Sequence, residues 1–224
     1  MESIVIAIGG SVIFSDEINE SYFLKLNNLL QNLTDKYKIY LVVGGGKKAR
    51  KFIDKGRKQA LSEEELDQIG INITRENAEV LSDKLENSNV IIPKSTDEAK
   101  RLQEKIIVMG GTTPGHSTDM VGAELAQKTN ASKFIVATNV DGVYDKDPNK
   151  FSDAKKYDEI KINKLIKQHG TDWKTAGKNT VIDGPALAII QKAKIPTFVL
   201  NGKNLNELKK AITDQQFNGT IIKI

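Results

Sequence analysis

Residues 39–50 read IYLVVGGGKKAR, a short apolar run that opens directly into three glycines and a basic segment. A run of this length and composition predicts a buried strand. Glycines after a strand let backbone N–H groups approach an anion, and a helix that follows adds its N-terminal dipole. This stretch therefore predicts a strand, a phosphate-binding turn and a helix.

The same design recurs along the chain. Helical spacing places Tyr22, Leu26 and Leu33 on one face, and Ser62 with Glu65 has the form of a capping box that opens a helix running towards Leu85. Further short Val- and Ile-rich runs predict strands at 4–8, 90–92, 106–109, 134–137 and 197–200. Strands that alternate with helices predict an α/β fold, a three-layer αβα sandwich around a central, mostly parallel sheet.

The chain shows no repeat, linker or low-complexity tract, so 1–224 is expected to form a single domain. Within this domain we expect only a weak division into an N-terminal lobe of about 1–130 and a C-terminal lobe of about 131–224, which composition alone does not mark. The polar stretch 145–163 is expected to be a hairpin or a long loop.

Composition excludes several classes of protein. No apolar run approaches the roughly 20 residues that span a bilayer, and the start lacks a basic leader, which indicates a soluble cytoplasmic protein. The absence of cysteine excludes disulfides, and two isolated histidines, His116 and His169, argue against a metal centre. The net charge of +4 is interleaved with acidic residues throughout, which favours a small anionic substrate over nucleic acid or membrane.

Four expected strands end in glycine- or hydroxyl-rich segments, and ligands of parallel sheets bind at these carboxyl ends. The segments are GGS at 9–11, GGGKKAR at 44–50, GGTTPGHSTD at 110–119 and TNVDGVYDKDP at 138–148. No Walker A motif is present. Gly44, Gly46 and Ala49 match a loose dinucleotide pattern, but Asp67, at the distance where its acidic residue is expected, falls inside a predicted helix, which disfavours an oxidoreductase.

These segments, together with LDQIGINITRENA at 66–78 and VIDGPALAII at 181–190, resemble the amino acid kinase superfamily and specifically its archaeal UMP kinase branch. The motifs occur in the order of the family and cover nearly the whole chain. The resemblance implies an amino acid kinase-like fold, transfer of the γ-phosphoryl group of ATP to UMP with Mg²⁺, and a cytoplasmic homo-oligomer, expected to be a hexamer. It further implies that the N-terminal lobe binds UMP and the C-terminal lobe binds ATP.

The resemblance also implies roles for individual residues. Arg50 and Asp183 are expected to act in catalysis. The position of Asp183 before Pro185 independently predicts a helix cap. The expected ATP contacts are Gly9, Gly10, Gly46, Arg50, Thr138, Asn139, Tyr144 and Asp147. The expected UMP contacts are Gly45, Asp67, Thr112, Thr113, Pro114, Gly115, His116, Ser117 and Thr118.

Two positions depart from the family pattern. Many relatives carry a lysine where this chain has Ala7, and the residues after Asp183 are Gly184 and Pro185 rather than Pro and Leu. Because the charge of a lysine is missing at Ala7, Lys47 at the mouth of the second glycine loop is the candidate replacement. Trp173 matches no motif and is expected to be structural.

The sequence alone is also compatible with two other functions. A kinase of the same superfamily could act on carbamate, acetylglutamate or isopentenyl phosphate, although the last uses a histidine near the second glycine loop that GGGKKARKF lacks. A non-catalytic nucleotide or oxyanion binder is the remaining alternative, and it would be expected to carry histidine clusters.

Overall fold

The computed structural model describes residues 1–14, 20–171 and 181–224, so Trp173 lies outside the described residues. In these ranges seven strands form one sheet in the order β3-β2-β1-β4-β6-β7-β5. All neighbouring pairs are parallel except β6 with β7. The strands are β1 (Glu2–Ile8), β2 (Tyr37–Val43), β3 (Ile106–Met109), β4 (Lys133–Thr138), β5 (Glu159–Lys161), β6 (Thr197–Asn201) and β7 (Gly219–Lys223).

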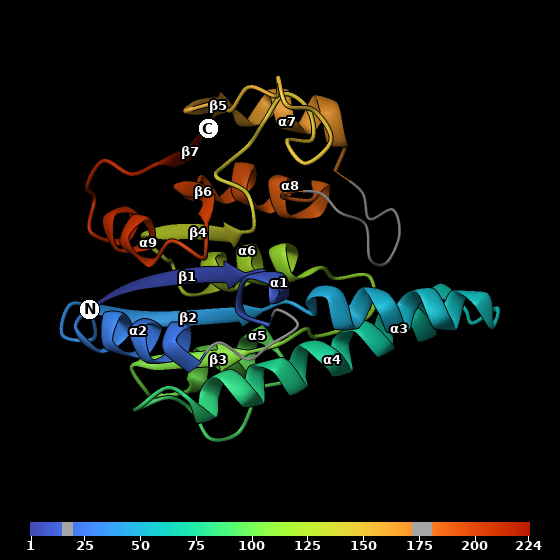
Figure 1. Cartoon of the computed structure of the whole chain (residues 1–224). Helices are drawn as coiled ribbons and strands as arrows, with labels where there is room; N and C mark the ends of the chain where they lie inside the picture. The colour runs from blue at the N-terminus through green and yellow to red at the C-terminus, as the bar shows by residue number, and fades with distance from the viewer. Residues whose placement is uncertain (15–19, 172–180) are drawn as a thin grey trace.

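Helices cover both faces of this sheet, as Figure 1 shows. One face packs against α2, α9 and the C-terminal half of α4, and the other against α5, α6, α7 and α8. The helices are α1 (Gly10–Ile13), α2 (Glu20–Gln31), α3 (Gly46–Lys58), α4 (Glu63–Asp83), α5 (Thr96–Arg101), α6 (Thr118–Lys128), α7 (Ile162–His169), α8 (Gly184–Ala193) and α9 (Leu205–Ile212). The expected three-layer α/β sandwich with a mostly parallel sheet is confirmed.

Five of the six strands expected from apolar runs are present, but the strand expected at 90–92 is wrong. The side chain of Asn89 donates to the carbonyl of Val108 at 2.9 Å and accepts from its N–H at 2.6 Å. One side chain therefore occupies the open edge of β3 at the point where a further strand would pair. Val90 and Ile91 point into solvent, with exposed fractions of 94% and 81%.

Sequence periodicity missed the two short strands at the far edge, β5 and β7. The polar stretch expected to be a hairpin or loop is a loop closed by an antiparallel bridge between Tyr144 and Lys156, and it leads into β5 and α7. β7 returns antiparallel to β6, which makes the sheet mixed. No helix within the described ranges is both long and apolar enough to cross a membrane.

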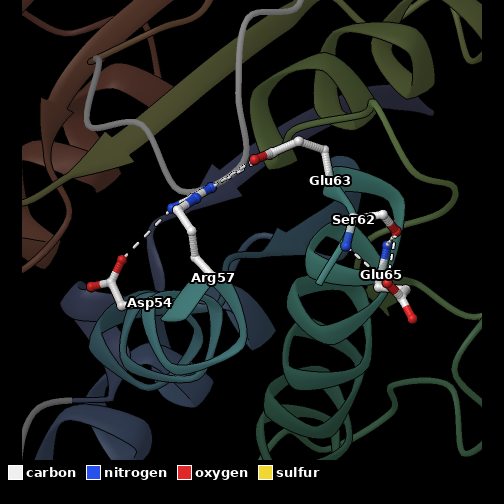
Figure 2. Close-up of polar contacts among 5 residues, drawn as sticks. All are labelled: Asp54, Arg57, Ser62, Glu63 and Glu65. Atoms are coloured by element: carbon white, nitrogen blue, oxygen red, sulfur yellow. Dashed lines mark hydrogen bonds and ion pairs between the residues drawn. The ribbon is translucent and has the colours of Figure 1, made fainter. Parts of the chain in front are cut away.

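Helices α3 and α4 form a hairpin that projects beyond the sheet in Figure 1. The expected capping box is present at the start of α4, where Ser62 and Glu65 bond each other's backbone N–H groups. Arg57 near the end of α3 reaches Glu63 at 3.2 Å and Asp54 at 3.8 Å, so polar contacts join the two helices at their turn (Figure 2). A cap contributes about 1 kcal/mol and an exposed ion pair about 0–1 kcal/mol, so the cap is the larger contribution.

The sheet order places the glycine-rich segments in a row. Strands β3, β2, β1 and β4 are neighbours and run parallel, so the loops that follow them share one edge of the sheet. The chain winds outward from β1 to β2 and β3, and then crosses to the other side of β1 at β4. Such a reversal opens a crevice at the carboxyl ends of the strands, where α/β proteins bind ligands.

Candidate active site

The first two glycine loops are in direct backbone contact. The N–H of Gly9 donates to the carbonyl of Ala137, and the N–H of Gly44 donates to that of Ile8, both at 2.9 Å. A Cβ on Gly10 would lie 2.4 Å from the carbonyl oxygen of Gly44, so only glycine fits there. The two loops therefore form one continuous floor above β1 and β2.

Basic side chains border this floor at the start of α3, which begins at Gly46. Arg50 donates from Nη2 to the hydroxyl of Ser11 at 2.9 Å, which directs its guanidinium towards the first loop. Lys47 is exposed in the first turn of α3. Lys48 instead forms an ion pair with Glu76 of α4 at 2.5 Å. The start of α3 thus places backbone N–H groups, Lys47 and Arg50 beside the glycine floor, where an anion could bind.

The β3–α6 loop (residues 110–117) contains six of the nine expected UMP contacts, from Thr112 to Ser117. Asp67 on α4 accepts the N–H of Gly115 at 2.6 Å, so the structure brings Asp67 and this loop together. Ser117 caps α6 by accepting the N–H of Met120 at 2.9 Å. Within the described residues, Thr112 Oγ1 and His116 Nδ1 are buried without a hydrogen-bond partner. Buried polar atoms are nearly always paired, so this loop retains hydrogen-bonding capacity for a ligand.

Asp183 lies beside this loop. Its Oδ1 accepts the N–H of Ala186 at 2.9 Å, which confirms the expected helix cap at the start of α8. Burial raises the pKa of Asp183, while hydrogen bonds from Ser117 and Ala186 oppose the rise. Burial, and then the neighbouring charge of Asp183, raise the pKa of Asp119 well above its usual range. The two carboxyls thus form a coupled acidic pair that the sequence did not reveal.

We expect Asp119→Asn to raise the melting temperature at pH 7. A carboxyl whose folded pKa is raised favours folding while it is protonated, and this contribution is lost as the pH rises from its unfolded pKa, near 3.8, through the folded value. The amide of Asn cannot ionise, so the variant avoids that loss. Each kcal/mol gained in the free energy of unfolding raises the melting temperature by about 2–4 °C in a chain of this size. Thermal denaturation at several pH values should show a gain of a few degrees at pH 7 that shrinks towards pH 4.

Asp97→Asn is the matched control, because the ion pair with Lys128 lowers the pKa of Asp97 instead. This control should show no gain at pH 7. A gain for Asp119→Asn that persists unchanged at pH 4 would contradict the linkage argument.

A pocket of about 280 Å³ lies beyond the carboxyl end of β4. It gathers four of the expected ATP contacts, namely Thr138, Asn139, Tyr144 and Asp147. Its lining also includes the apolar side chains Val143, Leu165 and Ile182, which suit the flat face of a nucleobase. We call it the β4 pocket.

Sequence reasoning missed the part of the β4 pocket supplied by α7. Gln168 and His169 line it from the end of that helix. No sequence motif marks these two residues, because only the folding of α7 against β5 brings them near β4. On α4, Arg75 and Asn77 were also missed, although they lie within LDQIGINITRENA, of which only Asp67 was singled out.

A larger groove of about 770 Å³ lies near loop 213–218. Among its charged side chains, Lys210 is paired with Glu207 at 2.7 Å. The groove contains none of the expected site residues, so the row of loops at the strand ends remains the candidate site.

Comparison with known proteins agrees with this geometry. Residues 2–201 match the model of the amino acid kinase family. The chain is 40% identical to a uridylate kinase of Methanocaldococcus jannaschii over 98% of this chain and 99% of that protein. It is 41% identical to a uridylate kinase of Thermoplasma volcanium over 94% and 93%. The solved uridylate kinase of Archaeoglobus fulgidus superposes with a TM-score of 0.85 at 36% identity, covering 99% of this chain and 100% of that one.

The match to the family model includes all four loops at the edge of the sheet, and the likeness to these relatives extends over nearly the full length of the chain. Sequence, sheet order and site geometry thus lead to one conclusion, that this chain belongs to the amino acid kinase family.

Proposed function

We propose that this chain transfers the γ-phosphoryl group of ATP to UMP, producing ADP and UDP. The observation that carries the proposal is the row of strand ends β3-β2-β1-β4. The β3–α6 loop lies at one end of the row, the β4 pocket lies at the other, and the glycine floor lies between them. Neighbouring strands are about 4.8 Å apart, so the two ends of the row are about 14 Å apart, and phosphate groups that reach inward from either end would meet above the floor. The names of the relatives support UMP as the acceptor.

The β3–α6 loop and its surroundings are the proposed UMP site. Thr112, Thr113, Pro114, Gly115, His116, Ser117 and Thr118 would surround the nucleotide, and Gly45 would approach its phosphate. In our proposal Asp67 holds the nucleoside as well as Gly115, because a carboxylate has room for more than one donor.

The β4 pocket is the proposed site of the ATP base and ribose, with Thr138, Asn139, Tyr144 and Asp147 as its contacts. The ATP phosphates would then lie over Gly9, Gly10 and Gly46, towards the N-terminus of α3. This placement uses the free N–H groups and dipole of a helix start, which favour phosphate.

In the proposed reaction, an oxygen of the UMP phosphate attacks the γ-phosphorus in line as the bond to the ADP oxygen breaks. ADP leaves with the bonding electron pair, and no covalent enzyme intermediate forms. Catalysis of this kind consists of positioning and charge stabilisation. Arg50 and Lys47 would stabilise the charge on the transferring group, and Asp183 would orient groups beside the β3–α6 loop.

Mg²⁺ would enter with ATP. Within the described ranges, no three His, Cys, Asp or Glu side chains gather into a group able to hold a metal ion. Mg²⁺ commonly binds through substrate phosphates and keeps several waters, so phosphate oxygens are its proposed ligands. Bound there, it would neutralise part of the phosphate charge.

The assembly and location of the protein are proposed from the family resemblance alone. On that basis we propose a cytoplasmic homohexamer. Each chain would form one domain with two lobes, in which residues of about 1–130 bind UMP and residues of about 131–224 bind ATP.

Two substitutions test the opposite ends of the row. Asp67→Ala is expected to raise the KM for UMP with little change for ATP, and Asp147→Ala is expected to do the reverse. Loss of a hydrogen bond from an ionised group costs about 1.5–3 kcal/mol, so each effect should be roughly 10- to 100-fold. Initial rates of ADP formation, with each substrate varied in turn, measure both constants.

The matched control is Glu64→Ala, because Glu64 is an exposed carboxylate in the first turn of the helix that carries Asp67. It should leave both KM values unchanged. If Asp67→Ala and Asp147→Ala each disturb both substrates equally, the assignment of the two ends to different nucleotides fails.

A further inference from the structure

Helix α4 contacts the second glycine loop (residues 44–46) and the β3–α6 loop at the same time. Asn77 donates from Nδ2 to the carbonyl of Gly44 at 2.9 Å, with a weaker contact to Gly45 at 3.4 Å. Thr74 Oγ1 accepts the N–H of Gly111 at 2.7 Å. Arg75 donates from Nε to the carbonyl of Gly111 at 3.0 Å and from Nη2 to that of Thr112 at 2.8 Å.

These side chains diverge from one stretch of helix. At about 100° per residue, Arg75 and Asn77 lie about 160° apart around the axis, with Thr74 between them. Arg75 therefore faces the β3–α6 loop while Asn77 faces the glycine loop. Three residues within one turn of α4 thus connect two loops that are separated in sequence by more than 60 residues.

The contact with the β3–α6 loop is close as well as polar. A Cβ on Gly110 would lie 2.7 Å from the backbone nitrogen of Arg75, so the loop rests directly on the backbone of α4. Thr74 and Asn77 are 8% and 6% exposed, which keeps water away from their hydrogen bonds. The helix itself is fixed at its start by the capping box described above.

The chemistry of Arg75 suits a positioning role. Its planar guanidinium presents two donors in a fixed fork, which matches two successive carbonyls. Both donors point to loop carbonyls, and among the described residues Arg75 forms no ion pair with a carboxylate. Two bonds from one rigid group fix both the position and the tilt of the loop backbone.

We propose that α4 is a splint that sets the distance between the proposed UMP site and the glycine floor, with Arg75 and Asn77 as its positioning residues. This inference rests on the proposed function, because the splint determines where the attacking phosphate lies. A misplacement of about 1 Å can cost roughly 100-fold in rate, so the spacing of the two loops bears directly on turnover. Neither residue touches substrate; each acts through a backbone segment that does.

Arg75→Ala is expected to raise the KM for UMP by roughly 10-fold or more and to lower kcat, while the KM for ATP changes little. Arg75→Lys should recover only part of the loss, since one ammonium cannot reproduce the two-donor fork. Millimolar guanidinium chloride should restore part of the activity of Arg75→Ala and none of that of Arg75→Lys. The matched control is Asn72→Ala, because Asn72 is exposed on the same helix. Its kcat and both KM values should equal those of wild type.

Asn77→Ala tests the other arm of the splint. It should lower kcat while changing the KM for UMP less than Arg75→Ala does, because it loosens the glycine floor rather than the β3–α6 loop. Thermal denaturation should accompany these assays. If Arg75→Ala folds poorly, Arg75→Lys keeps the test decisive, because it should fold yet still show a raised KM for UMP that guanidinium does not restore.

Hydrogen exchange of residues 110–117 without nucleotide separates this inference from the proposed function. Arg75→Ala should speed exchange in this loop relative to wild type and to Asn72→Ala. Unchanged exchange, or equal changes in the KM values for UMP and ATP, would overturn the splint even if wild type uses UMP. Faster exchange in a protein that does not use UMP would instead overturn the proposed function and leave the mechanical link in place.

Discussion

Lys47→Ala is expected to lower kcat by at least about 100-fold, the magnitude of removing one preorganised charge contact. The KM values for UMP and ATP should change little, because the contact strengthens as charge develops on the transferring group. The family resemblance implies a lysine at position 7, but this chain has Ala7 there, which is buried in β1 with 1% exposure. Lys47 stands in the first turn of α3, directly after Gly46, and is the proposed replacement.

Lys48→Ala is the matched control for this prediction. Lys48 is half-exposed and paired with Glu76, and an exposed ion pair of this kind contributes about 0–1 kcal/mol. Its removal should leave kcat and both KM values near wild type. Steady-state kinetics decide the matter, since full activity in Lys47→Ala would leave the charge to Arg50 and Mg²⁺ alone and contradict the role of Lys47.

Local pattern predicted most of the secondary structure. Apolar runs located five strands, and the capping box at Ser62 located the start of α4. The error at 90–92 arose because apolar composition alone does not specify pairing: Asn89 satisfies the edge of β3 with its side chain, and Pro93 follows soon after. β5 and β7 were missed because their sequences, EIK and GTIIK, lack the longer apolar runs that located β3 and β6.

The candidate site was predictable in its parts but not in its arrangement. The glycines that follow β1, β2 and β3 in the sequence predicted anion-binding turns. The order of strands in a sheet depends on contacts distant in the chain, so no local pattern revealed that the four loops form one row. Arg75 and Asn77 escaped notice for a similar reason, since a polar residue on a helix looks the same whether it meets water or a loop carbonyl.

Buried electrostatics were also invisible in the sequence. Asp119 and Asp183 are separated by 64 positions, and only the meeting of α6 with the start of α8 makes them a coupled pair. The sequence did show that Asp183 would cap a helix, because Pro185 follows at a favoured position for Pro near a helix start.

The proposed function depends above all on the preference of the protein for UMP over other acceptors. Purified protein should convert UMP and ATP with Mg²⁺ into UDP and ADP, followed by ³¹P NMR or by separation of the nucleotides. CMP, AMP, carbamate, acetylglutamate and isopentenyl phosphate should react far more slowly at equal concentration, and ATP without an acceptor should remain stable. ADP should form rapidly from ATP only when UMP is the acceptor. Equal or faster reaction with any of the other acceptors would contradict the proposed function.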